Sequence, residues 1–416
     1  MWWPWRGRRR AQVSQPERRA EVAWASLAMP IRAWSIRNAV PIEQPDCVVD
    51  LTVDDGRFVS SEALEECVDL DGAWWFPGLV NGHDHLGFSN APLTAVGAPY
   101  ASMTEWAAYA KPSAKKGALA RALRVPLVER LWIGMVRNLL SGATTAVHHD
   151  PAHSVMGPGA LVHVPPIAWT HSLTHGQDPE RAYASRTGST PFVLHLAEGT
   201  DRVSREEYDL AVQRDLIGPG TVIVHGVALT VAQMRDLAAR GGALVWCPSS
   251  NQALYGKTLD PAEVPSTLPL MLGTDSPLSG GPLLLEEARV AVALGFPEER
   301  LLAMLTEVPG KVFCTRQQFD ADVGAPADGF AIERRSDDPV RDLLTTRPEQ
   351  LLLVVSAGRP LLVDASLEGN FSQEYQDVVF RHQRKRVRTE VIAPIRHLLE
   401  DESVFPDRWT SAASTA

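Results

Sequence analysis

The chain has 416 residues, of which 45% are apolar and 22% are charged, and its formal net charge is -10. This length and composition predict a globular protein with a large core, or a large domain with a small companion. The negative charge argues against a nucleic-acid-binding protein, whose affinity would depend on a basic surface. No apolar run in the sequence approaches the roughly 20 residues of a membrane span, so we expect no membrane partner.

Two features bear on location and on the ends of the chain. The four cysteines are far apart and form no CxxC pair, which predicts reduced thiols in a cytoplasmic protein. Residues 1–28 place tryptophans beside an arginine cluster, without the apolar core of a secretory signal. We expect a disordered leader there, or translation that starts at Met29.

Short β-branched and aromatic runs predict strands in residues 29–75, and similar runs return in residues 319–365. We expect these two flanking segments to share one small β-sheet domain. Residues 366–416 are predicted as a helical tail. Its basic side chains fall on one helical face, which favours a solvated surface over an anionic partner; they are Arg381, Arg384, Lys385 and Arg388.

Residues 76–318 alternate between strand-like runs, such as FVLHLAE and TVIVHGV, and amphipathic helical runs, with helix caps expected at Ser204 and Thr230. This alternation indicates an α/β fold with parallel strands, and a TIM-type (β/α)8 barrel is the leading architecture. A doubly wound open sheet is the alternative, although no GxGxxG or Walker loop supports it. The stretch between TTAVHH and FVLHLAE is short for two strand–helix units, and LVHVPPIAWTHS supplies two strands at most. A complete barrel and a trimmed one both remain open.

Polar residues with metal-binding chemistry end several of the predicted strands. His83 and His85 are two apart, so on a strand both side chains point the same way. His195, His225 and Asp275 end three later runs. A packed histidine or a helix-capping aspartate would explain each residue alone, but the carboxyl ends of barrel strands converge on one site. The combination therefore favours a Zn²⁺ or Fe²⁺ site with an open position for water.

The motifs PGLVNGHDH, HLAE, VHG, CPSSN and GTDS occur in the order typical of the amidohydrolase superfamily. Over roughly residues 31–365 the chain resembles the branch of cytosine, guanine and adenosine-type deaminases and the chlorohydrolase-like triazine hydrolases. The resemblance implies a small-molecule substrate and allows a homodimer. It also implies roles for six residues: His83, His85, His195 and Asp275 as metal ligands, Glu198 as proton shuttle, and His225 as a contact of the attacking water or of the substrate.

These roles agree with the chemistry of the side chains. A divalent metal lowers the pKa of a bound water to about 7. Asp275 is suited to accept a proton from that water, and Glu198 to deliver one to the leaving nitrogen as general acid. His225 is suited to polarise the group under attack.

One divalent metal is expected, Zn²⁺ first and Fe²⁺ as the alternative. Binuclear relatives use a carbamylated lysine from mid-barrel, and residues 117–256 contain no lysine. The alternative is a second ion held by His148, His149 and His171.

Six further residues are candidates for substrate binding, although each also has an ordinary structural explanation. Five are chosen by their position at a strand end, and Trp106 by its place in the lid-like stretch SMTEWAAYAKPS. The set is His149, His171, Trp106, Trp169, Asn90 and Ser276. Asn251 in CPSSN is expected to tie down a loop through its side chain.

The function predicted first is deamination of a small nitrogen heterocycle by a metal-activated water. One alternative is hydrolysis of a cyclic amide or amidine ring, as in imidazolonepropionase-like relatives. The other is a metal-binding scaffold without catalytic activity. Specificity in such folds depends on loops, so the sequence leaves the substrate open.

Overall fold

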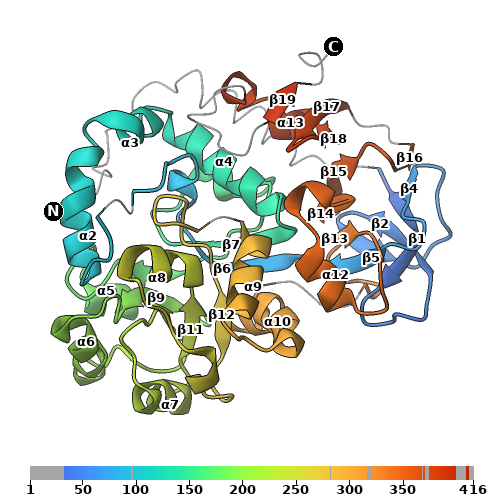
Figure 1. Ribbon diagram of the computed structural model, residues 1–416. Helices are drawn as coiled ribbons and strands as arrows, with labels where there is room; N and C mark the ends of the chain where they lie inside the picture. The colour runs from blue at the N-terminus through green and yellow to red at the C-terminus, as the bar shows by residue number, and fades with distance from the viewer. Residues whose placement is uncertain are drawn as a thin grey trace.

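The computed structural model describes residues 32–94, 97–281, 283–315, 321–367, 369–370, 374–399 and 409–411. The predicted leader, residues 1–28, lies outside them. Figure 1 shows a region of strands surrounded by helices beside a separate, strand-rich region built from both ends of the chain. This confirms the predicted α/β class with a separate β-sheet.

The strand-rich region joins two parts of the chain that are far apart in sequence. Its strands before residue 78 are β1 (Trp34–Pro41), β2 (Val49–Asp54), β3 (Arg57–Val59), β4 (Cys67–Asp69) and β5 (Trp74–Pro77). Those after residue 328 include β13 (Gly329–Ile332), β14 (Leu353–Ser356) and β15 (Arg359–Asp364). β5 pairs antiparallel with β13, which joins the two parts. Successive β5 side chains enter different apolar clusters, Trp74 on one face and Trp75 on the other, because strand side chains alternate.

The predicted helical tail is wrong for residues 375–388, which form two antiparallel strands. They are β17 (Tyr375–Phe380) and β18 (Gln383–Arg388), and β18 extends the sheet from β15. Arg381 and His382 both have positive φ, 45° and 75°, as the central residues of a tight hairpin turn require. The basic side chains therefore alternate between faces: Lys385 is fully buried and paired with Asp364, whereas Arg384 reaches the exposed Asp377.

Short elements complete this end of the chain. They are β16 (Gly369–Asn370), α13 (Thr389–Ile392), the 3-10 turn η5 (Arg396–Leu398) and β19 (Trp409–Ser411).

The helix-rich region is built on parallel strands. Five form one sheet in the order β12-β11-β10-β9-β8, and β6 pairs with β7. Two isolated parallel bridges add to these sheets. One joins Asp84, the last residue of β6, to Asp275 after β12, and the other joins Thr145 of β7 to His163. The bounds are β6 Leu79–Asp84, β7 Ala143–His148, β8 Ala168–Thr170, β9 Phe192–Leu196, β10 Thr221–His225, β11 Ala243–Trp246 and β12 Leu270–Leu272.

Helices follow most of these strands and cover their outer side (Figure 1). The predicted cap Thr230 forms a capping box at α7. At α6 the cap is Asp201 and not Ser204, because the Asp201 carboxylate accepts the Ser204 N–H. The helices are α2 (Met103–Ser113), α3 (Gly117–Ala122), α4 (Leu127–Leu139), α5 (Pro179–Ala184), α6 (Arg202–Gln213), α7 (Val231–Ala239), α8 (Pro248–Tyr255), α9 (Leu284–Ala293), α10 (Glu298–Leu305), α11 (Glu307–Val312) and α12 (Pro339–Thr345).

The connection from β7 to β8 is reduced. In this fully described stretch the only helical element is the 3-10 turn η2 (Ser154–Met156). The segment LVHVPPIAWTHS gives the single strand β8 and the bridge at His163, where the sequence had suggested two strands. Two prolines in its middle remove backbone donors and interrupt the ladder.

The remaining 3-10 turns are η1 (Leu86–Phe88), η3 (Pro261–Glu263) and η4 (Pro348–Gln350). Cys47, Cys67, Cys247 and Cys314 are all free thiols. Among the described helices, none has the length and apolarity needed to cross a bilayer.

Candidate active site

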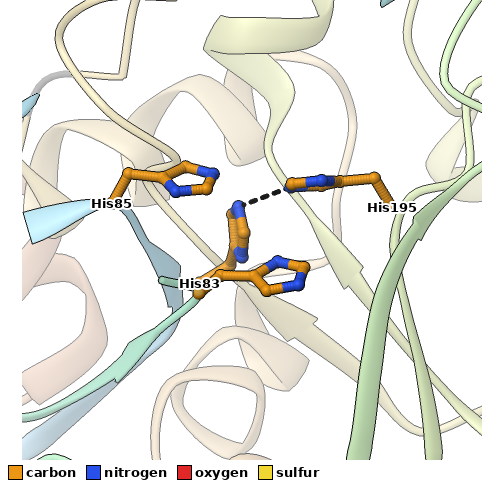
Figure 2. A group of neighbouring side chains, drawn as sticks. His83, His85 and His195 are labelled. Carbon is orange, nitrogen blue, oxygen red and sulfur yellow. Dashed lines mark hydrogen bonds between the residues drawn. The ribbon is translucent and has the colours of Figure 1, made fainter. Parts of the chain in front are cut away.

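Buried histidines and one aspartate converge at the carboxyl ends of the parallel strands. Nε2 of His83 lies 3.1 Å from Nε2 of His195 and 3.7 Å from Oδ1 of Asp275. Nε2 of His85 lies 3.6 Å from the same aspartate oxygen. Figure 2 shows the rings of His83, His85 and His195 turned toward one another. The four residues predicted as metal ligands are therefore neighbours in space.

The local backbone explains this convergence. His83 in β6 and His85, the residue directly after the strand, face the cluster. Asp84 between them accepts a hydrogen bond from Asn138 on the other side at 2.7 Å, as strand alternation requires. β6 and the end of β12 approach closely because residue 273 is a glycine: a Cβ there would lie 2.8 Å from the His83 Cβ. Asp275 has a φ of 58°, a rare conformation for a non-glycine residue that occurs often at functional sites.

Most imidazoles of the cluster are neutral. Burial lowers the pKa of His83 to about 4 and the pKa of His195 to well below its usual range. Burial would also lower the pKa of His85, but Asp150 and Asp275 outweigh it and raise that pKa to about 9. Burial acts to raise the pKa of Asp275, but a hydrogen bond with His83 and the other histidines hold it well below its usual range.

The donor set fits a divalent cation. One group of ligand atoms, from His83, His85, His149 and His195, lies within 4.8 Å of one another, and so does a second group from His83, His225 and Asp275. Neutral imidazole nitrogens with a carboxylate are ligands that Zn²⁺ and Fe²⁺ accept. A cation bound at Nε2 of His85 would replace a proton there, because metal ligands bind deprotonated.

Hydrogen bonds behind the cluster fix the orientation of its side chains. Nδ1 of His85 lies 2.9 Å from a carboxylate oxygen of Asp150, and Nδ1 of His195 lies 2.9 Å from the carbonyl oxygen of His171. Both rings therefore direct Nε2 toward the cluster, as metal-binding histidines typically do. The sequence analysis missed Asp150, although it directly follows His148 and His149 at the end of β7.

A second pair of ionisable groups borders the cluster. Oε1 of Glu198 lies 3.6 Å from Nε2 of His225. Burial raises the pKa of Glu198, which favours a carboxyl group that carries a proton. The turn that presents Glu198 is held by Glu207, whose carboxylate accepts the N–H of Ala197 at 2.8 Å. Ala197 itself has a φ of 54°.

Helix α8 supports the same groups from behind. Ser250 donates to Oδ2 of Asp275 at 2.6 Å, and the Asn251 amide oxygen lies 2.9 Å from Nδ1 of His225. Tyr255 donates to Oε1 of Glu198 at 2.6 Å. Asn251 was expected to tie down a loop and does so by donating to the Thr258 hydroxyl at 3.2 Å, while its amide oxygen faces a site histidine. Ser250 and Tyr255 were not foreseen, since nothing local in the sequence places them beside distant strand ends.

The other histidines occupy different positions. Nε2 of His149 lies 3.0 Å from the Thr170 carbonyl oxygen, and its ring centroid is 5.1 Å from that of His83. His148 accepts the N–H of Leu86 at Nδ1, 3.3 Å away, and is in neither group of ligand atoms. The structure thus brings His149, but not His148, into the cluster.

A pocket lined by His85, His195, Glu198, His225 and Asp275 opens at the cluster. Of the six substrate-binding candidates, His171, Trp106 and Ser276 line it, but His149, Asn90 and Trp169 do not. Asn90 donates to the Ala122 carbonyl oxygen at 3.0 Å, and Trp169 packs edge-on against His149. The lining also has a mostly apolar part, formed by Phe88, Met103, Trp106, Leu254 and Leu278.

Comparisons with known proteins were made by sequence and by structure. Residues 168–350 match the sequence profile of the Amidohydrolase family. A 5-methylthioadenosine/S-adenosylhomocysteine deaminase of Haloquadratum walsbyi is 30% identical over 137 residues, which are 30% of this chain and 31% of that protein. The chain thus matches about a third of the length of this curated relative.

Solved structures extend the likeness in fold. A zinc-bound adenosine deaminase of Xanthomonas campestris superposes with a TM-score of 0.56 at 19% identity, covering 80% of this chain and 92% of that one. N-isopropylammelide isopropylaminohydrolase of Burkholderia multivorans gives 0.55 at 19% identity over 80% and 98%. Aminofutalosine deaminase of Helicobacter pylori gives 0.56 at 13% identity over 80% and 100%. The profile match over residues 168–350, together with these folds, confirms the predicted resemblance of the chain to the amidohydrolase family.

Proposed function

We propose that the protein is a metal-dependent hydrolase that deaminates a small nitrogen heterocycle. The observation that carries this proposal is the position of Glu198 and His225 at the edge of the histidine–aspartate cluster, facing one pocket. The apolar part of the pocket lining supports a flat, uncharged ring as substrate, since such surfaces favour apolar and aromatic groups. The deaminases among its relatives support the same reaction class.

We assign the metal to His83, His85, His195 and Asp275, with one divalent cation per chain. Zn²⁺ is the first candidate, supported by the zinc-bound relative, and Fe²⁺ the second. When bound, such an ion supplies a water of lowered pKa at neutral pH. His149 is an alternative ligand, because its nitrogen also lies within the group of His83, His85 and His195. Loss of metal from a His149→Ala variant would identify it as one.

The side chains then divide the proton transfers. Water attacks the ring carbon that bears the amino group, and the C–N bond breaks to give a ring carbonyl and ammonia. Asp275 accepts a proton from the water, and Glu198 delivers a proton to the departing nitrogen. Asn251 holds the proton of His225 on Nδ1, so Nε2 points to the reacting group, where it accepts a proton or, once protonated, stabilises the developing oxyanion.

We also propose that β6–β12 close into a TIM-type barrel that is trimmed between β7 and β8. The bridges at Asp84 and Thr145 support closure, and the absent helix after β7, within the described residues, supports the trimming. A cytoplasmic location and a homodimer stay predictions.

The test combines metal analysis with a panel of aminated heterocycles, scored for free ammonia. One equivalent of Zn or Fe per chain and ammonia release would support the proposal. Ring opening without ammonia would favour the cyclic amide or amidine hydrolase. A metal-loaded protein that turns over nothing in either assay would favour the inert scaffold.

A further inference from the structure

Tyr255 and Glu198 form a buried pair at the edge of the pocket. Tyr255 is the last residue of α8, and its hydroxyl lies 2.6 Å from Oε1 of Glu198. Both residues are almost fully buried. Burial and the neighbouring carboxylate raise the pKa of the Tyr255 phenol well above its usual range, so the phenol keeps its proton and acts as a donor.

The two oxygens of Glu198 differ in their surroundings. Oε1 accepts the Tyr255 hydrogen bond and lies 3.6 Å from His225. Oε2 is buried and has no hydrogen-bond partner. A buried carboxylate oxygen without a partner is costly, and a proton on that oxygen relieves the cost when a ligand accepts it.

We propose that Tyr255 is a positioning residue that occupies Oε1 of Glu198 and thereby leaves Oε2 as the oxygen that exchanges the proton with the substrate. This inference deepens the proposed function and rests on it. The phenol fixes the carboxyl plane, and a protonated Oε2 is available to the departing nitrogen. Without the phenol, the carboxyl group can rotate and present either oxygen.

Helix α8 gives this contact a rigid support. The helix runs from Pro248 to Tyr255 and is capped by Gly256, whose φ of 60° accommodates the left-handed turn directly after Tyr255. The same helix holds Asp275 through Ser250. Two substitutions on one helix therefore separate two effects, since Ser250 contacts a proposed metal ligand and Tyr255 contacts the proton carrier.

The first experiment compares Tyr255→Phe with Ser250→Ala and with the exposed Gln252→Ala as control, all metal-loaded. For an amino heterocycle, Tyr255→Phe is expected to lower kcat on the order of tenfold, the loss expected for one buried hydrogen bond. KM and metal content should stay within about twofold. Ser250→Ala should instead weaken metal binding, measured by chelator competition, and Gln252→Ala should change neither quantity.

The leaving group separates positioning from a merely structural role. A chloro analogue of the same ring needs no protonation of its leaving group, so Tyr255→Phe should slow it much less than the amino substrate. An equal loss on both substrates, or an unchanged kcat on the amino substrate, would overturn the proposal.

A second readout needs no turnover. Infrared difference spectra identify the carboxyl stretch of Glu198 as the band lost in Glu198→Gln, and Tyr255→Phe should shift that band. An unshifted band would refute the inference even if the proposed function holds. A shifted band in a protein that releases no ammonia would support the contact between Tyr255 and Glu198 and contradict the proposed deaminase function.

Discussion

The two halves of the candidate site are held in different ways. The metal-binding half takes its side chains from strand ends, and the His85 ring is fixed by Asp150, two residues after β7. The proton-transfer half consists of Glu198, two residues after β9, and His225, the last residue of β10, and both are fixed by α8. His225 has a φ of 72°. Strand ends thus bring the metal ligands together, and Ser250 of α8 adds a contact to Asp275. Side chains of α8 orient both Glu198 and His225.

The largest expected effect comes from removing the proton carrier. Glu198→Gln keeps the size and the Tyr255 contact but cannot deliver a proton, so turnover should fall by about 10²-fold or more. Metal content, measured on the purified variant, should match the wild type. Loss of metal together with activity would show that the two halves are not separable.

Asp150→Asn is expected to weaken metal binding while leaving proton transfer intact. The amide no longer favours the protonated Nδ1 of His85, so metal affinity should fall about 10- to 100-fold. Chelator competition measures this affinity directly. Turnover at saturating metal should recover most of its wild-type value, and failure to recover would place Asp150 in proton transfer as well.

A smaller effect, on KM, is expected for a substitution of Trp106 in the apolar part of the pocket lining. The indole Nε1 of Trp106 is buried without a hydrogen-bond partner, and Trp106 lines the pocket. If a substrate acceptor binds this donor, Trp106→Phe should raise KM about 3- to 10-fold with kcat nearly unchanged. The exposed Tyr109 on the same helix, changed to Phe, is the matched control. An unaffected KM would remove Trp106 from substrate recognition.

The smallest expected effect is on the pH dependence of Tm, through Glu287, which contacts the start of α8. Burial raises the pKa of Glu287 to about 8, although the N–H of Ser249 near the start of α8 donates to it at 3.3 Å. Its folded-state pKa is above the unfolded value, so its contribution to stability is complete below about pH 4.3 and is lost as pH rises through about 8. Glu287→Gln should flatten the fall of Tm across this window. If Tm falls equally with pH in the wild type and in Glu287→Gln, the raised pKa of Glu287 is not the cause.

Much of the fold was predictable because periodicity is local. Alternating strands and helices in residues 76–318 indicated parallel pairing, and the flanking β-branched runs indicated the second sheet. The tail at residues 375–388 was mispredicted because basic side chains at regular spacing fit a helix, whereas pairing with β15 and the hairpin turn at Arg381 decided for strands.

The available chemistry could be inferred from the sequence alone. Strand-end position and motif order identified six residues that the structure brings together: His83, His85, His195, Glu198, His225 and Asp275. The side chains that support these six through hydrogen bonds depend on how the chain packs. Asp150, Ser250 and Tyr255 contact the site across long stretches of chain. Local sequence carries no signal for such contacts, because hydrogen-bond geometry depends on how distant elements pack. Packing likewise excluded Asn90 and Trp169 from the pocket, although their positions along the strands resembled those of His171 and Ser276.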